Sequence, residues 1–169
     1  MTMWGAEWGS GGQGSTGPLP ADIAADSRLD GPDRRGFWFV MLRSGILNPH
    51  LLSLLARVRH TNTIVIADSM FPHWPGLVEV DLSLVPGIPT VPQVVAAVLA
   101  GWKAGPVWMA EEFRKTNDDG VQQEFAAAFR GAEVRFEPHL VLKARVPGAL
   151  GVVRTGETRI YTNVVLGSA

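Results

Sequence analysis

The sequence contains no cysteine, and this absence removes several kinds of chemistry at once. Without thiols the chain can form no disulfide bond, supply no thiolate nucleophile and build no cysteine-based zinc or iron–sulfur site. Long apolar runs are missing too, since none approaches the roughly 18–20 residues that a membrane-spanning helix needs. The formal net charge is only −1, which does not favour nucleic acid or an anionic membrane surface as a partner. We therefore expect a cytoplasmic protein that needs no metal or cofactor.

Motifs that mark large enzyme classes are absent as well. No G-x-G-x-x-G sequence joins a strand to a helix, and the chain lacks a P-loop, an H-E-x-x-H pair and a G-x-S-x-G elbow. Histidine occurs four times and tyrosine once, at Tyr161. Few side chains are therefore available for acid–base chemistry, and the positions of these few become informative.

The first part of the chain differs from the rest in composition. Residues 1–36 are rich in Gly, Ser, Pro and Asp and show no periodic apolar spacing, so they cannot bury enough surface to offset their ordering entropy. The remaining length suits one domain with a sizeable core. We predict a disordered N-terminal extension over residues 1–40 and a single domain over residues 41–169.

Beyond residue 44, apolar patterns of helical type and of strand type alternate. Helices are predicted over residues 49–60, 92–103, 119–130 and 138–145. Strands are predicted over residues 63–67, 77–82, 107–110, 134–136, 150–153 and 160–166, the last two joined around a turn at 155–157. This alternation indicates an α/β fold, a three-layer domain with a central, mainly parallel or mixed sheet flanked by helices.

Two candidate functional residues flank the first predicted strand. His60 follows the first helix, and an imidazole with a pKa near its ordinary value of about 6.5 can both give and take a proton at neutral pH. The alternative is a histidine that only complements the dipole at the helix end. Asp68 ends an apolar strand, and open α/β sheets bind ligands outside the carboxyl ends of their strands. Here the alternative is an Asx-turn residue.

The other candidates lie in the second half of the chain. His139 is expected in the first turn of a short helix, either as a neutral hydrogen-bond partner or simply as an exposed residue. Tyr161 and Asn163 are predicted on one face of the last strand, where a phenol beside an amide suits a polyol. A core tyrosine is the alternative. Trp74, which follows His73 in the loop after Asp68, is a further candidate for stacking on a sugar.

The order of these residues, with the sequence around them, resembles the D-ribose pyranase family from Gly45 to the C-terminus. The stretches that carry the resemblance are GILNPHL (45–51), HTN (60–62), IVIAD (64–68), VDLSLVPGIP (80–89), the short His139 helix, VVRTGE (152–157) and YTN (161–163). The Arg154-Thr155-Gly156-Glu157 segment by itself is compatible with an anion grip and with a charged β-turn.

The resemblance implies a function and a site. It implies a cofactor-free isomerase that converts the pyranose form of a free monosaccharide, D-ribose first of all, to the furanose by acid–base ring opening and re-closure. It implies His60 as the proton donor and a ring-like homodecamer with sites at protomer interfaces. The residues that it assigns to sugar binding are Asp68, His139, Tyr161, Thr162 and Asn163.

Departures from the family pattern keep two further readings open. Asn62 stands where the ribose enzymes commonly carry Asp, which removes a possible partner of His60. The loop over residues 70–75 is bulkier than in the ribose enzymes, and its Phe71-Pro72 is similar to the L-fucose mutarotases. The alternatives are therefore an L-fucose-type mutarotase and a non-catalytic sugar-binding or regulatory protein of the same fold.

Overall fold

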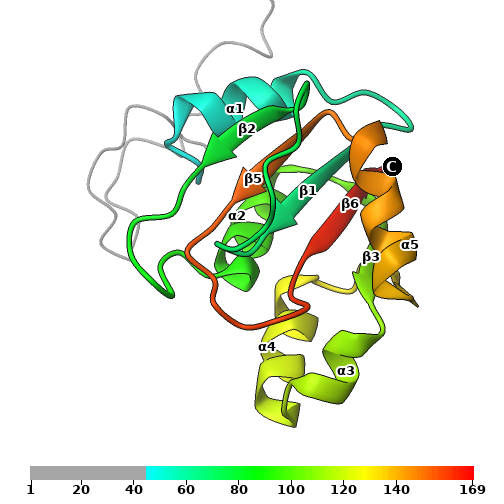
Figure 1. Ribbon diagram of the computed structural model, residues 1–169. Helices are drawn as coiled ribbons and strands as arrows, with labels where there is room; N and C mark the ends of the chain where they lie inside the picture. The colour runs from blue at the N-terminus through cyan, green and yellow to red at the C-terminus, as the bar shows by residue number, and fades with distance from the viewer. Residues whose placement is uncertain (1–44) are drawn as a thin grey trace, which may run out of the picture. The chain divides into compact units, whose positions relative to one another are not determined.

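The structure of the protein is a computed structural model that describes residues 45–169 (Figure 1). The predicted N-terminal extension over residues 1–40 lies outside the described residues and stays a prediction, as does the domain boundary at residue 41. Within the described part, six strands form one mixed sheet in the order β2-β5-β1-β6-β3-β4. None of the helices in this part of the chain is long and apolar enough to cross a membrane.

The helices and strands alternate along the chain, as the apolar patterns predict. The strands are β1 (Thr63–Ala67), β2 (Val78–Asp81), β3 (Ala104–Ala110), β4 (Val134–Glu137), β5 (Gly151–Arg154) and β6 (Val164–Ser168). The helices are α1 (Pro49–Ala56), α2 (Val91–Gly101), α3 (Glu112–Thr116), α4 (Asp119–Ala128) and α5 (His139–Arg145), followed by the 3-10 turn η2 (Val146–Gly148). The sequence pattern missed α3, because five residues are too few to show a helical period.

The strand directions bring the carboxyl ends of most strands to the same end of the sheet. β6 runs antiparallel to both its neighbours, β1 and β3, while the pairs β1–β5, β2–β5 and β3–β4 are parallel. The carboxyl ends of the five parallel strands therefore share an edge with the start of β6. The expected pairing of the last two strands around a turn at 155–157 is wrong, because β1 lies between β5 and β6.

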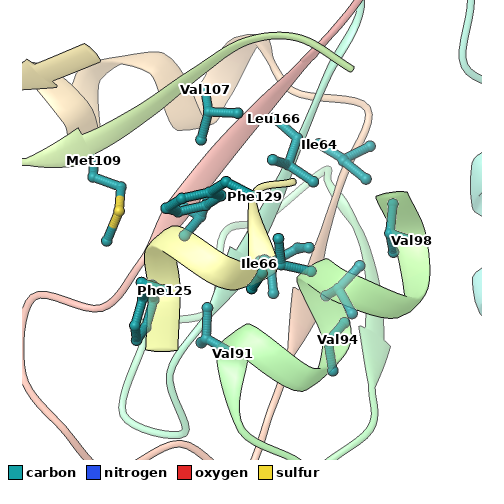
Figure 2. Close-up of a cluster of buried hydrophobic side chains, with 14 of the residues drawn as sticks. Ile64, Ile66, Val91, Val94, Val98, Val107, Met109, Phe125, Phe129 and Leu166 are labelled. Atoms are coloured by element: carbon teal, nitrogen blue, oxygen red, sulfur yellow. The ribbon is translucent and has the colours of Figure 1, made fainter. Parts of the chain in front are cut away.

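Helices cover both faces of the sheet, which confirms the predicted three-layer α/β fold. On one face, Ile64 and Ile66 of β1 pack with α2 and with Phe125 and Phe129 of the α4 region (Figure 2). The alternate residues of β1 point to the other face. There the buried cluster is Val65, Ala67, Phe71, Ala110, Leu142, Val146, Ala149, Val152 and Val165, with Leu142 contributed by α5.

Side-chain caps explain where the longer helices begin. The Asn48 side chain accepts a hydrogen bond from the Leu51 N–H at 2.9 Å, and a proline follows the cap directly. Thr90 and Gln93 form a capping box at the start of α2, each side chain binding the other's main-chain N–H. These short-range signals are visible in the sequence.

The first helix ends earlier than the expected boundary near His60. It stops at Ala56, and the N–H of Arg59 donates to the side-chain oxygen of Asn62 instead of continuing the helical ladder. Thr61 then takes a left-handed backbone conformation with φ of 68°. Asn62 therefore closes the turn that carries His60, a role that local turn chemistry allows Asn to play.

Gly156 brings the RTGE segment into close contact with the 85–89 loop. Its N–H donates to the Pro89 carbonyl at 2.9 Å, and its carbonyl accepts from the N–H of Gly87. A β-carbon at Gly156 would lie 2.3 Å from the Ile88 carbonyl oxygen and 2.5 Å from that of Val85. Only glycine lets the RTGE segment approach the 85–89 loop this closely.

We predict that Gly156→Ala destabilises the fold by about 1–3 kcal/mol or more, because backbone atoms in contact on both sides cannot move aside as a flexible side chain would. The matched control is Gly148→Ala, where an added β-carbon meets nothing within 4 Å. Chemical denaturation of the two variants measures the difference. Equal stabilities would show that the 85–89 loop adapts freely.

Candidate active site

A pocket of about 240 Å³ opens at the sheet edge where β1 ends and β6 begins. This volume lies a little below the roughly 300–1,000 Å³ of pockets for drug-sized ligands, so it suits a small polar molecule. We call it the site pocket. Its lining residues are Asp68, Met70, Phe71, Pro72, His139, Lys143, Ile160, Tyr161 and Asn163.

Asp68 and Asn163 bind each other through two hydrogen bonds. The Asp68 N–H donates to Oδ1 of Asn163 at 2.8 Å, and Nδ2 of Asn163 donates to Oδ2 of Asp68 at 2.8 Å. The antiparallel pairing of β1 with β6 makes this possible, because Ile66 lies opposite Val164 and the residues just beyond them meet. Oδ1 of Asp68 also accepts from the Met70 N–H at 3.0 Å. The carboxylate is thus held firmly at the pocket wall.

The environment of Asp68 raises the pKa of its carboxyl. Burial raises the pKa of this carboxyl above its ordinary value, and the hydrogen bonds from Asn163 and Met70 and the positive charge of Arg154 offset burial only in part. Nearby Glu157 raises the pKa further. A carboxylate whose pKa is raised is a stronger base, so Asp68 is suited to accept a proton from a ligand hydroxyl.

His139 and Tyr161 also line the site pocket. Their rings meet edge to face, with centroids 5.1 Å apart and planes at 85°. His139 is the first residue of α5, as predicted, and its main-chain N–H donates to the Glu112 carboxylate. Nδ1 of His139 is buried without a hydrogen-bond partner among the described residues. The two rings therefore present one imidazole and one phenol to the same small space.

The placement of Tyr161 differs from the sequence prediction. Tyr161 and Asn163 do not share one face of a strand, because β6 begins only at Val164. Tyr161 has φ of 59°, in the left-handed region that a tyrosine rarely adopts and that costs of order 1–3 kcal/mol. The expectation of neighbouring phenol and amide groups holds, but a strained turn and not strand alternation brings them together.

Three other candidates do not line the site pocket. The Thr162 hydroxyl is buried and donates to the Arg159 carbonyl at 2.9 Å, so this side chain serves the turn. His73 pairs through Nδ1 with Oε2 of Glu79 at 2.9 Å. Trp74 packs against the buried cluster beneath α5. Because its hydroxyl is already used in the turn, Thr162 can contact a ligand only through its main-chain atoms.

His60 lies at the opposite end of the sheet from the site pocket, before the start of β1. It precedes β1, whereas Asp68 follows it, and a five-residue strand is roughly 16 Å long. The turn that carries His60 is joined to the end of β6 by the Ser168 hydroxyl, which donates to the Arg59 carbonyl. His60 is exposed and makes no hydrogen bond with its ring among residues 45–169. Within one copy of the chain, the predicted proton donor and the site pocket are apart.

Sequence reasoning missed Lys143 and Ile160 as pocket residues. Lys143 lies four residues after His139 on α5, so both side chains occupy one face of the helix, and this spacing was the available signal. A second cavity of about 510 Å³, bordered by Phe113, Phe129 and Phe136, lies away from all the candidate residues. Among the described residues, no group of His, Asp or Glu could hold a metal ion.

Comparison with known proteins identifies the family. Residues 41–169 match the RbsD / FucU transport protein family. The chain belongs to this family. It is 41% identical to the D-ribose pyranase of Geobacillus kaustophilus over 128 residues, which are 76% of this chain and 93% of that protein. It is 34% identical to the D-ribose pyranase of Bacillus subtilis over 126 residues, 75% of this chain and 95% of the relative.

Solved structures of the family share the fold. The structure of Bacillus subtilis RbsD complexed with D-ribose matches with a TM-score of 0.71 at 33% identity, covering 76% of this chain and 98% of that one. The fucose mutarotase of Streptococcus pneumoniae, in complex with L-fucose, matches with a TM-score of 0.60 at 18% identity, covering 72% and 92%. This second likeness shows the fold alone. The predicted family resemblance is confirmed.

We predict that the pKa of Asp68, followed by NMR titration of its carboxyl carbon, lies above the ordinary value. In Asn163→Ala it rises further, because the variant loses a hydrogen bond that stabilises the carboxylate. Gln122→Ala, which removes an amide that binds the Arg114 and Asn117 carbonyls and does not line the site pocket, is the control and leaves the Asp68 titration in place. An unchanged titration in Asn163→Ala would contradict the assigned contact.

Proposed function

We propose that this protein interconverts the cyclic forms of a free monosaccharide, D-ribose first of all, between pyranose and furanose. The observation that carries the proposal is the site pocket, in which a half-buried carboxylate, an imidazole, a phenol and an amide surround a space fit for one sugar. The identity to proteins named D-ribose pyranase and the likeness to a ribose-bound structure support the same substrate class.

Acid and base groups alone can catalyse this reaction. The anomeric hydroxyl loses its proton to a base, the carbon–oxygen bond to the ring oxygen breaks, and the ring oxygen takes a proton from an acid, which leaves an open-chain aldehyde. After rotation about the carbon chain, a different hydroxyl attacks the aldehyde and the same groups return the protons. Well-placed acid–base groups contribute about 10²–10⁴-fold to such a reaction.

In this proposal Asp68 accepts the anomeric proton, which its raised pKa favours. Tyr161 and Asn163 position the sugar hydroxyls, together with the imidazole of His139 and the main chain at Thr162. His60 donates the proton to the ring oxygen. Because His60 lies at the opposite edge of its own sheet, it reaches a pocket only in a neighbouring copy of the chain.

The surface around the pocket supports a homo-oligomer, which we propose to be a decamer in the cytoplasm. Met70 and Ile160, which line the pocket mouth, are 86% and 61% exposed, and Leu140 on the adjoining helix is 80% exposed. Large apolar side chains gathered at one place on a surface are typical of a protein interface. An interface here would place a second copy directly over the pocket.

Saturation-transfer NMR of D-ribose tests the activity. We expect faster exchange between pyranose and furanose signals with the protein than in buffer, and loss of about 10²–10⁴-fold of that acceleration in His60→Ala. His50→Ala, a change to another exposed histidine, is the control and should exchange ribose at the wild-type rate. Exchange no faster than buffer would rule out ribose as the substrate.

The same measurement over a panel of sugars separates the alternatives. Phe71 and Pro72, the pair similar to L-fucose mutarotases, line the pocket and favour an L-fucose-type activity as the second candidate. Faster anomer exchange of L-fucose than of D-ribose would select it. Binding of a sugar by calorimetry without any exchange would select a sugar-binding or regulatory protein.

Mixed oligomers test whether His60 acts in the pocket of another copy. His60→Ala and Asp68→Asn are each expected to be inactive alone. Co-assembled in equal amounts, they should restore about a quarter of the sites, since such a site needs an intact His60 from one copy and an intact Asp68 from the other. No recovery in verified mixed oligomers would show that both groups come from one chain or that His60 is not the donor.

A further inference from the structure

Arg154 at the end of β5 binds the loop that follows β1. Its Nη1 donates hydrogen bonds to the Ser69 carbonyl, at 3.2 Å, and to the Phe71 carbonyl. Its Nε donates to Oε1 of Glu79 on β2 at 2.7 Å. One guanidinium thus joins the 69–71 loop to two strands of the sheet. The sequence of this segment is compatible with anion binding, but the Arg154 guanidinium already forms hydrogen bonds with groups of the protein.

Asp68 also binds the 69–71 loop through its side chain and its main chain. Oδ1 of Asp68 accepts from the Met70 N–H at 3.0 Å, and the main-chain oxygen of Asp68 accepts from the Phe71 N–H at 3.3 Å. Arg154 and Asp68 therefore bind alternating groups of one short segment. If Arg154 released its two carbonyls, the segment could turn, and the Met70 N–H would leave the carboxylate.

Arg154 is not itself part of the pocket lining, whereas Asp68, Met70 and Phe71 are. Only 13% of the Arg154 side chain is exposed, so solvent competes little for its hydrogen bonds. A planar guanidinium with several donors in a fixed geometry can bind two carbonyls and a carboxylate together, which a lysine ammonium does less well. Any influence of Arg154 on a bound sugar must therefore pass through the loop or through its charge.

We propose that Arg154 is a positioning residue for ring opening: by binding the carbonyls of Ser69 and Phe71 it holds the Asp68 carboxylate and the Phe71 side of the pocket where the sugar meets them. This inference rests on the proposed function. It assigns to the RTGE segment a task in the site although none of its four residues lines the pocket.

The positive charge of Arg154 also affects the pKa of Asp68, which gives a second measurement that tests the proposal. Burial raises the pKa of Asp68, while Asn163, Met70 and the positive charge of Arg154 lower it, and Glu157 raises it. Removal of the Arg154 charge therefore raises the pKa of Asp68. If activity needs an ionised Asp68, the acid limb of the pH–activity profile then lies at a higher pH than in the wild type. The other titratable side chains that line the same pocket are His139, Lys143 and Tyr161.

Two substitutions separate the charge from the hydrogen bonds. Arg154→Gln removes both, so we expect kcat/KM for ribose exchange to fall by about 10²-fold, as for a misplacement of about 1 Å, with the acid limb moved to higher pH. Arg154→Lys keeps the charge, so its limb stays near that of the wild type while kcat/KM is still reduced. Arg135→Gln is the control, since it removes an exposed guanidinium that pairs with Glu133 at the far edge of the sheet.

Amide hydrogen exchange of peptides covering residues 69–77, followed by mass spectrometry, reports on the loop without reference to activity. Both Arg154 variants should exchange faster there than the wild type, and the control should not. Unchanged hydrogen exchange in Arg154→Gln overturns the proposal, and so does faster hydrogen exchange with wild-type kcat/KM and acid limb. If Arg154→Gln fails to fold, Arg154→Lys still tests the proposal: unchanged hydrogen exchange over residues 69–77, or a wild-type kcat/KM, overturns it.

The outcome distinguishes this inference from the proposed function. A wild-type protein that opens no sugar ring contradicts the proposed function. In that case hydrogen exchange over residues 69–77, with ribose binding to wild type and Arg154→Lys by calorimetry, still decides whether Arg154 maintains the pocket. A wild-type protein that is active, with Arg154 variants that match it in all readouts, contradicts the inference alone.

Discussion

The paired hydrogen bonds between Asp68 and Asn163 are the contact on which the candidate site depends. They join the end of β1 to the start of β6, and they satisfy a main-chain N–H and a carboxylate oxygen of the same residue. An ionised carboxylate has about four lone-pair positions, so Asp68 keeps acceptor capacity for a ligand. A half-buried base is thus held in place without being neutralised by a salt bridge.

The RTGE segment links this contact to the rest of the fold. Arg154 binds the loop after β1, Gly156 packs against the 85–89 loop, and the Glu157 carboxylate accepts a long hydrogen bond, 3.4 Å, from the Val91 N–H at the start of α2. Burial alone would raise the pKa of Glu157, but the hydrogen bonds and charge of Arg159, together with the hydrogen bond from the Thr158 N–H, outweigh burial and hold that pKa below its usual range. The VDLSLVPGIP and RTGE stretches, on which the predicted resemblance rests, are therefore in direct contact.

The separation of His60 from the pocket has a functional consequence in the proposed mechanism. A base and an acid at opposite edges of one sheet can act on the same sugar only when two copies of the chain meet. Activity would then depend on assembly, and the exposed Met70, Leu140 and Ile160 beside the pocket would serve both the interface and the enclosure of the sugar. Asn62, which departs from the family pattern, has a local task instead, because it closes the turn that presents His60.

Features of the fold that depend on near neighbours were predictable from the sequence. The Asn48 cap, the buried strand that ends just before Asp68 and the helix that begins at His139 rest on contacts within a few residues, and all three are present. The end of α1 was misjudged, because the helix stops at Ala56 and a turn follows in which the Asn62 side chain binds the Arg59 N–H. Family resemblance, and not residue chemistry alone, placed Asp68, His139, Tyr161 and Asn163 in one site.

The sequence by itself determined the alternation of helices and strands, the α/β layers and the identity of most polar groups in the pocket, because apolar periodicity and capping act over one or two turns of chain. Only the tertiary structure decided that β1 lies between β5 and β6, that Tyr161 reaches His139 from a left-handed turn, and that Arg154 holds the Asp68 loop. Contacts of this kind join residues that are distant in sequence, such as Asp68 and Asn163, which are 95 positions apart. Local pattern carries no information on which distant strands become neighbours, since pairing is settled by how all the buried faces pack together.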